Sequence, residues 1–266
     1  MSSTPQMAEA PELVTTRIEG GVATLTMNQG DRFNPLSTRM IEALVAALVR
    51  VAADRTTSVV VLAGAGRGFC AGHDLREMRA HSADKAWQAA LFESCSRMMQ
   101  KITQIPQPVV ARVHGVASAA GCQLVATCDL AVAAEEARFA LPGVNVGLFC
   151  STPAVAVARN VSRKRAMELL LTGELFDART ALSWGLVNRV VPADRLDAEV
   201  ARFTSIIVAR SGSVVASGKR AFYRQIEQPI GAAYALTSEV MACGMVEPEA
   251  AEGIDAFLQR RPARWP

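Results

Sequence analysis

Two glycine-rich passages have the residue types and spacing to present backbone amides to one oxygen atom of a ligand. They span residues 59–75 and 108–124. Each begins with an apolar run of strand length, continues into small residues and then enters a helical pattern. Small residues let other atoms approach the backbone, and the first amides of a helix have no partner within the helix. Two such turns side by side would form an oxyanion hole from main chain alone.

Both passages resemble the crotonase (enoyl-CoA hydratase/isomerase) family. Its first turn reads Phe-x-Ala-Gly-x-Asp-Leu, and residues 69–75 read Phe-Cys-Ala-Gly-His-Asp-Leu. Its second turn reads Gly-x-Ala-x-Gly-Gly-Gly, and residues 115–121 read Gly-Val-Ala-Ser-Ala-Ala-Gly. Further matching motifs lie at 128–130, 137–139, 147–148, 171–173 and 185–187, so the resemblance covers residues 13–260. It implies an α/β fold, a crotonase-like spiral of repeated ββα units followed by a helical C-terminal oligomerisation region.

The resemblance also implies which amides form the oxyanion hole. They are the N–H groups of His73 and Ala120, which would bind a thioester carbonyl and stabilise the enolate formed from it. Each such donor is typically worth about 10²–10³ in rate. His73 is expected to act through its backbone, with its imidazole free to point into solvent. The alternative is a catalytic role for the imidazole itself.

Residues that would hold coenzyme A follow from the same comparison. Arg76 and Arg32 are expected near its phosphates, because a guanidinium donates two hydrogen bonds to a phosphate at once. Ala71 and Asp74 complete the predicted coenzyme A contacts. Asp74 is also expected to cap the helix that follows it.

The acid–base groups of a hydratase are missing. Hydration of an enoyl thioester needs a base and an acid, and family hydratases use two glutamates whose positions here hold Gln123 and Gly143. Each such group ordinarily contributes about 10²–10⁴ in rate, so ordinary hydratase activity is doubtful. The position of an aspartate in some isomerases is Ser151. One hypothesis is that Gln123, Cys150 and Ser151 orient water or substrate for another enolate reaction or for thioester hydrolysis. The other is that Cys150 is a small buried hydrophobic residue.

The two glycine-rich turns and the family resemblance together predict an enzyme of the hydratase/isomerase type, with its specific reaction left open. The alternative is a non-catalytic acyl-CoA-binding protein of the same fold. The expected partners are an acyl-CoA thioester and further copies of the chain, as a homotrimer or a dimer of trimers. No cofactor is expected beyond the coenzyme A of the substrate, and no metal.

Composition argues against several other classes. A net charge of +3 with scattered basic residues gives no reason to expect a nucleic-acid partner. No apolar run approaches the roughly 18 residues of a membrane span. The six cysteines show no metal-ligand spacing, which indicates reduced thiols. The first ten residues lack the basic and apolar parts of a targeting peptide, so a cytoplasmic location is expected.

Local patterns predict the elements that position the two turns. Residues 1–11 are small and polar and predict a mobile tail, residues 12–195 the spiral core with the acyl-CoA site, and residues 196–266 a helical C-terminal region. Strands are expected at 13–18, 22–27, 59–62, 129–133, near 139 and at 186–191. Helices are expected from 35, at 87–102, 153–159, 162–171 and 177–185, and from 196 onward with breaks near 212, 229 and 248.

Overall fold

Two sheets form the framework of the computed structural model, which describes residues 12–266. The predicted tail, 1–11, lies outside the described residues. The larger sheet has six strands, all parallel except the first antiparallel pair, in the order β1 (Val14–Glu19), β2 (Val22–Met27), β3 (Val59–Gly64), β4 (Val109–Val113), β6 (Leu130–Ala134) and β9 (Arg189–Val191). The smaller sheet has three strands, β5 (Val116–Ser118), β7 (Arg138–Ala140) and β8 (Phe176–Asp177).

Strands from β4 onward enter the two sheets in pairs, which produces the spiral predicted from the family resemblance. β4, β6 and β9 extend the larger sheet, whereas β5, β7 and β8 build the smaller one. Helices and short 3-10 turns separate the strands. Before the first pair, η1 (Gly30–Arg32) lies between β2 and β3, and α2 (Leu75–Ala80) lies between β3 and β4. Successive pairs are connected by α4 (Ala120–Thr127) and then by η2 (Pro142–Val146), α5 (Ser151–Val157) and α6 (Arg163–Thr172), whereas α7 (Ala178–Trp184) lies between β8 and β9 and η3 (Ala193–Arg195) follows β9. The fold is therefore a crotonase-type α/β spiral, as expected.

The centre of the larger sheet is buried on both faces, which explains why the strand β3 is a continuous apolar run. In β3, Val60 and Leu62 belong to the main core, and Val59 and Val61 belong to a second cluster on the opposite face. The main core includes residues of α1 (Thr38–Ala53) and α3 (Lys85–Gln104), and the second cluster includes residues of α8 (Leu196–Val208). Parallel strands covered on both sides require this composition.

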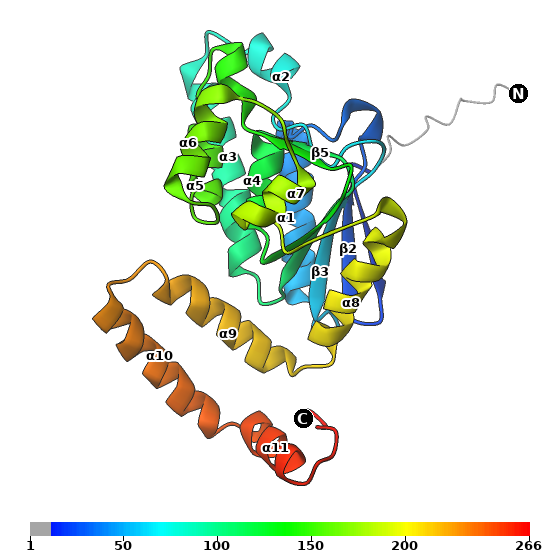
Figure 1. Ribbon diagram of the computed structural model, residues 1–266, viewed down its shortest axis with the longest axis vertical. Helices are drawn as coiled ribbons and strands as arrows, with labels where there is room; N and C mark the ends of the chain where they lie inside the picture. Colours follow the sequence, from blue (N-terminus) through cyan, green and yellow to red (C-terminus); the bar gives the residue numbers. More distant parts are fainter. Residues whose placement is uncertain (1–11) are drawn as a thin grey trace, which may run out of the picture.

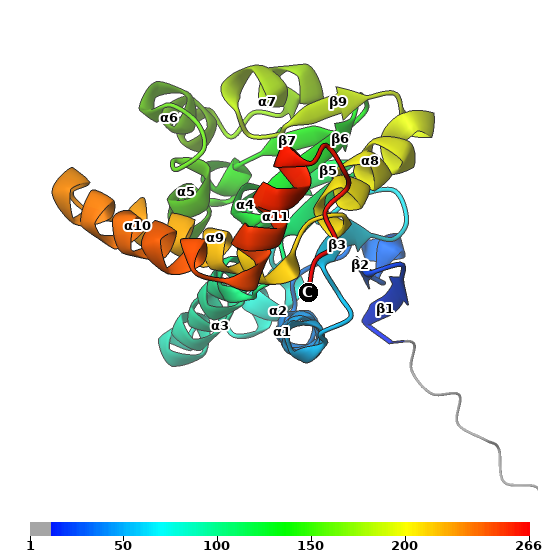
Figure 2. The same cartoon turned by 90° about the horizontal axis from the view of Figure 1, so that it is seen from below.

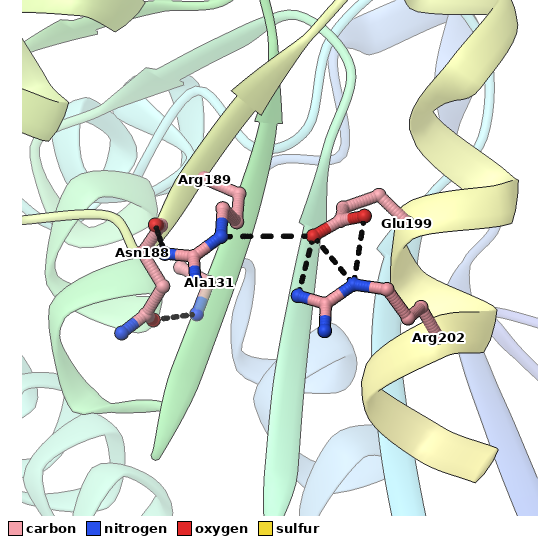
Figure 3. Close-up of polar contacts among 5 residues, drawn as sticks. All are labelled: Ala131, Asn188, Arg189, Glu199 and Arg202. Atoms are coloured by element: carbon pink, nitrogen blue, oxygen red, sulfur yellow. Dashed lines mark hydrogen bonds and ion pairs between the residues drawn. The ribbon is translucent and has the colours of Figure 1, made fainter. Parts of the chain in front are cut away.

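Polar contacts at the edge of the larger sheet involve β6, β9 and α8, as shown in Figure 3. The Asn188 side chain accepts a 2.8 Å hydrogen bond from the Ala131 amide, and the Asn188 amide donates to the Ala131 carbonyl, also at 2.8 Å. Arg189 of β9 and Arg202 of α8 both contact the Glu199 carboxylate, at 3.7 and 2.7 Å. Both arginines are exposed, so their ion pairs contribute little to stability. The Asn188 bonds join the start of β9 to β6, and apolar packing holds α8 on the sheet.

Three further helices extend away from the sheets, as Figures 1 and 2 show: α9 (Gly212–Gln225), α10 (Ile230–Met245) and α11 (Pro248–Leu258). A largely buried ion pair joins α9 to the core, where Lys219 Nζ donates to Asp129 Oδ2 at 2.7 Å and Tyr223 donates to Asp129 Oδ1 at 2.8 Å. No helix within residues 12–266 is both long and apolar enough to cross a bilayer.

Large apolar side chains are exposed along these three helices. Their exposed fractions reach 76% for Ile230, 83% for Val246 and 82% for Phe257. Tyr234 and Met241 of α10 are also exposed. Many large exposed apolar side chains on consecutive helices and the turn between them are typical of an interaction surface.

Candidate functional site

The two glycine-rich turns are in direct contact. Cys70 and Ala117 form an isolated parallel bridge, and the Ser118 amide donates to the Cys70 carbonyl at 2.9 Å. Gly121, in the first turn of α4, lies against the same carbonyl, because a Cβ atom at this position would be 2.0 Å from the Cys70 oxygen. Only glycine permits this approach of the two backbones.

The geometry leaves the amides of His73 and Ala120 free. The Leu36 amide donates to the Gly72 carbonyl at 2.8 Å, and the Asp74 amide donates to the Leu36 carbonyl at 3.4 Å. In a parallel bridge of this kind the His73 amide points away from Leu36. Ala120 is the first residue of α4, so its amide has no partner within the helix. Within residues 12–266 neither amide donates a hydrogen bond.

The two free amides belong to neighbouring backbone. A Cβ atom at Gly72 would lie 3.2 Å from the Ala120 nitrogen and 2.9 Å from the Ser118 carbonyl oxygen. Gly72 has φ +93°, and Ala119, just before α4, has φ +49°. Left-handed backbone at a non-glycine residue is strained, and such strain concentrates at functional sites.

Asn34 holds the first turn and was not predicted from the sequence. Its Nδ2 atom lies 2.9, 2.9 and 3.0 Å from the carbonyl oxygens of residues 65, 68 and 69, and its Oδ1 accepts from the Gln29 amide at 2.9 Å. The side chain is fully buried, and its backbone has φ +51°. Asparagine tolerates this conformation better than most residues. A single buried amide group thus fixes the strand end that leads to His73.

A cavity of about 430 Å³ opens beside the two amides. Six predicted site residues line it: Ala71, His73, Ala120, Gly143, Cys150 and Ser151. Most of the remaining wall is apolar and comes from α2, α3, η2, the loop after η2 and the start of α5, including Leu75, Met78, Phe92, Pro142, Val146, Leu148, Phe149 and Pro153. Among the described residues, no carboxylate, lysine or arginine lines it.

The His73 side chain packs at the cavity wall, which differs from the solvent-facing ring considered from the sequence. Its ring meets the Phe92 ring edge-on, with the centroids 5.3 Å apart. Its Nε2 atom is buried without a hydrogen-bond partner among residues 12–266. Burial lowers the pKa of the imidazole from 6.5 to about 4, against the opposing influence of the Glu77 carboxylate. The ring is therefore neutral at pH 7.

Gly143 lies where neighbouring groups leave no room for a side chain. A Cβ atom would be 2.7 Å from the Leu148 carbonyl oxygen and 2.9 Å from Cys150 Sγ. The Gly143 amide donates to that sulfur at 3.3 Å. Burial raises the pKa of the Cys150 thiol, so the sulfur stays protonated and uncharged. These contacts favour the interpretation of Cys150 as a small buried residue over that of a nucleophile.

Gln123 and Ser151 occupy different surroundings. Gln123 is 4% exposed, its Oε1 atom has no partner among the described residues, and it is not part of the cavity wall. Ser151 is exposed at the start of α5, and its hydroxyl donates to the Phe149 carbonyl at 3.4 Å. The structure does not bring Gln123 together with Cys150 and Ser151 in one polar cluster at the cavity.

The residues predicted to contact coenzyme A lie around the N-terminus of α2. Of these, only Ala71 is part of the cavity wall. Asp74 caps α2 as predicted, since its Oδ1 accepts from the Arg76 amide at 3.0 Å. Its Oδ2 pairs with Arg32 Nη2 at 2.6 Å. The Arg76 side chain is exposed and makes no ion pair with the residues described. Within the same residues no group of three or more His, Cys, Asp or Glu is arranged to hold a metal ion.

Comparisons with known proteins agree with this architecture. The family model described as enoyl-CoA hydratase/isomerase matches residues 17–266. The mitochondrial enoyl-CoA hydratase domain-containing protein 3 of Mus musculus is 43% identical over 255 residues, which are 96% of this chain and 85% of that protein. An enoyl-CoA hydratase structure from Mycobacterium smegmatis is 52% identical with a TM-score of 0.93, covering 95% of this chain and 98% of that one. The structure of the human domain-containing protein 3 is 42% identical with a TM-score of 0.92, covering 95% and 100%.

One expectation is overturned by these relatives. The proteins from Mus musculus, Rattus norvegicus, Xenopus laevis and Homo sapiens are all named mitochondrial, so the cytoplasmic location expected from the sequence is wrong. Reduced cysteines argue against an oxidising compartment but do not distinguish one reducing compartment from another. The matches of sequence and of fold give a consistent assignment: this chain belongs to the enoyl-CoA hydratase/isomerase family of enzymes, in the crotonase superfamily.

Proposed function

We propose that this protein binds an acyl-CoA thioester in the cavity and stabilises its enolate through the amides of His73 and Ala120. Proteins of this family bind acyl-CoA substrates. The observation that carries the proposal is the pair of unpaired amides on touching turns at the edge of an apolar cavity. Donors that are fixed before the reaction stabilise developing charge without having to reorganise.

The coenzyme A moiety would run from the cavity toward the N-terminus of α2. Arg76 is exposed there and offers its whole guanidinium to a phosphate. Arg32 keeps one nitrogen on Asp74 and has further N–H groups to donate, because its side chain is 47% exposed. Asp74 would then position both arginines and would not contact coenzyme A itself.

Ordinary hydration is not the reaction that this site favours. Among the described residues the cavity wall carries no carboxylate, and Gly143 has no room for one. The resulting candidates are an enolate reaction with a different proton-transfer group, or an acyl-CoA-binding protein without turnover. The uncharged wall supports the second candidate as well as the first, and a turnover screen with several acyl-CoA esters separates them.

We also propose a homotrimer or a dimer of trimers. The exposed apolar side chains of α9, α10 and α11 support this assembly, because a monomer would leave them in water. Light scattering on the full chain tests the proposal. A monodisperse monomer at micromolar concentration would contradict it.

The binding proposal is tested by comparing butyryl-CoA with S-butyl-CoA, a thioether that lacks only the carbonyl oxygen. Two hydrogen bonds to the carbonyl, at about 0.5–1.5 kcal/mol each, predict a thioester affinity about 5–150 times higher by calorimetry. Equal affinities for the two compounds would mean that the amides do not contact the carbonyl. If neither compound binds, the acyl-CoA assignment itself is wrong.

A further inference from the structure

Among the described residues that line the cavity, one side chain is suited to accept a proton at neutral pH. The other polar side chains of the cavity are three hydroxyls, an amide and a thiol, from Ser118, Ser151, Thr152, Asn145 and Cys150. Hydroxyls and amides are not bases near pH 7, and burial keeps the Cys150 thiol protonated. The remaining group is the imidazole of His73, which has a free lone pair when neutral.

The His73 ring is held in place but left without a polar partner. Phe92 of α3 packs edge-on against it, and its Nε2 atom is buried with no hydrogen bond among residues 12–266. Because Nε2 has almost no accessible surface, a ligand in the cavity does not reach it. The other ring nitrogen, Nδ1, also makes no hydrogen bond with residues 12–266 but is not among the buried atoms, so it is the one that a substrate in the cavity can meet.

The covalent connection between the amide and the ring is also informative. If the His73 amide holds the thioester oxygen, the substrate's α-carbon lies one bond from the carbonyl carbon. A base for the α-proton must therefore lie close to the same amide, and the Cβ atom of His73 is two bonds from the amide nitrogen. Proximity of this kind is a large part of catalytic power.

We propose that the His73 imidazole is the catalytic acid–base group that moves the α-proton of the bound acyl thioester. This inference rests on the proposed function above. The ring nitrogen takes the proton from the α-carbon, and the C–H electron pair forms the enolate double bond. The negative charge then moves to the thioester oxygen, where the amides of His73 and Ala120 hold it. Return of the proton from the imidazolium to the same carbon closes the cycle with no other reactant.

The basicity of the ring suits this task. With a pKa of about 4, the buried imidazole matches an ordinary glutamate, whose pKa is about 4.3. The charged group that acts on it is Glu77 of α2, which accepts a 3.0 Å hydrogen bond from the Thr38 amide, whereas Phe92 of α3 carries no charge. His73 thus supplies the basicity of the absent carboxylates without placing a negative charge beside the enolate.

The test is exchange of the α-protons of butyryl-CoA for deuterium in heavy water, followed by mass spectrometry. His73→Gln keeps the backbone N–H and should leave the Kd for butyryl-CoA within about threefold, while exchange falls by about 10²–10⁴. Added imidazole should restore part of the exchange in His73→Ala. His81→Gln is the matched control, because His81 stacks on Trp87 with centroids 4.1 Å apart and is not part of the cavity wall.

The possible results are distinct. If wild type binds butyryl-CoA and exchanges its α-protons, but His73→Gln exchanges equally fast, this inference is wrong and the proposed function stands. If wild type binds without exchange, both the inference and the enolate part of the proposed function are wrong. Should the variants fail to fold, the wild-type pH profile decides. A rate that is level above about pH 5 and falls toward pH 4 supports His73, and a tenfold rise per pH unit up to pH 9 contradicts it.

Discussion

A single added methyl group at Gly121 should disrupt the contact between the two glycine-rich turns. Gly121→Ala adds a Cβ that would lie 2.0 Å from the Cys70 carbonyl oxygen and 2.8 Å from its carbonyl carbon. These are backbone atoms and cannot rotate away as a flexible side chain would. We expect α4 to move away from the first turn, which separates the amides of His73 and Ala120.

The expected magnitudes follow from this overlap. Overpacking of this kind typically costs about 1–3 kcal/mol of stability, or about 2–4 °C in Tm for each kcal/mol. Loss of both hydrogen bonds to the carbonyl should weaken butyryl-CoA binding by about 5–150-fold, from about 1–3 kcal/mol. Binding of S-butyl-CoA should change little, since it has no carbonyl oxygen. Calorimetry with both compounds measures the difference.

Gly218→Ala is the control, because nothing lies within 4 Å of a Cβ at this position of α9. It should preserve thioester binding and raise stability slightly, since alanine favours a helix by up to about 1 kcal/mol. If Gly121→Ala is folded and keeps the wild-type preference for the thioester, the turns do not position the carbonyl, and the reasoning is refuted.

Three further predictions concern stability and reaction type. Lys219→Met should lower the free energy of unfolding, measured by urea denaturation, by about 3–5 kcal/mol, because it leaves Asp129 buried without its cation. A loss under 1 kcal/mol would argue against a stabilising role of the Lys219–Asp129 ion pair. Gly143→Glu should not raise crotonyl-CoA hydration, because the Leu148 carbonyl oxygen lies 2.7 Å from the new Cβ; a clear rise in hydration would disprove this crowding. The pKa of His73 is about 4 when folded against an ordinary 6.5, so the unfolded chain takes up the proton first as pH falls. Stability should therefore drop by about 3 kcal/mol between about pH 6.5 and 4 through this residue, and His73→Gln should remove that part of the loss; an unchanged pH dependence would contradict the shift.

Local signals predicted most of the fold. Short-range patterns predict the pair of strands on either side of Gly20 and Gly21, the apolar strand β3 and the helix α7, whose N-cap is Asp177, and the structure has them. The helix expected at 162–171 is α6, which begins at Arg163; the side chain of Ser162, the residue before it, accepts no capping bond. The strand expected at 186–191 begins only at Arg189. Leu186 and Val187 are apolar because they are buried in the core, although they lie before the strand. Burial and strand pairing give similar sequence patterns, so this boundary was not predictable.

The site was predicted only in part, for a physical reason. Small residues at a turn can be read locally, and the two turns do meet. Contacts between residues that are far apart in the sequence cannot be predicted from local patterns. Asn34 reaches carbonyls 31–35 residues later, and Cys150 folds back seven residues to fill the space beside Gly143. The burial of the His73 ring against Phe92 likewise depends on how α3 packs on the first turn.

The central claim is that two backbone amides hold the thioester carbonyl. Infrared difference spectroscopy of butyryl-CoA with a ¹³C-labelled carbonyl tests it most directly, because hydrogen bonding lowers the C=O stretching frequency. Bound to the wild-type protein, the labelled band should move below its position in water, and Gly121→Ala should reverse most of that shift. A band that stays at or above its position in water when the thioester is bound would contradict the account.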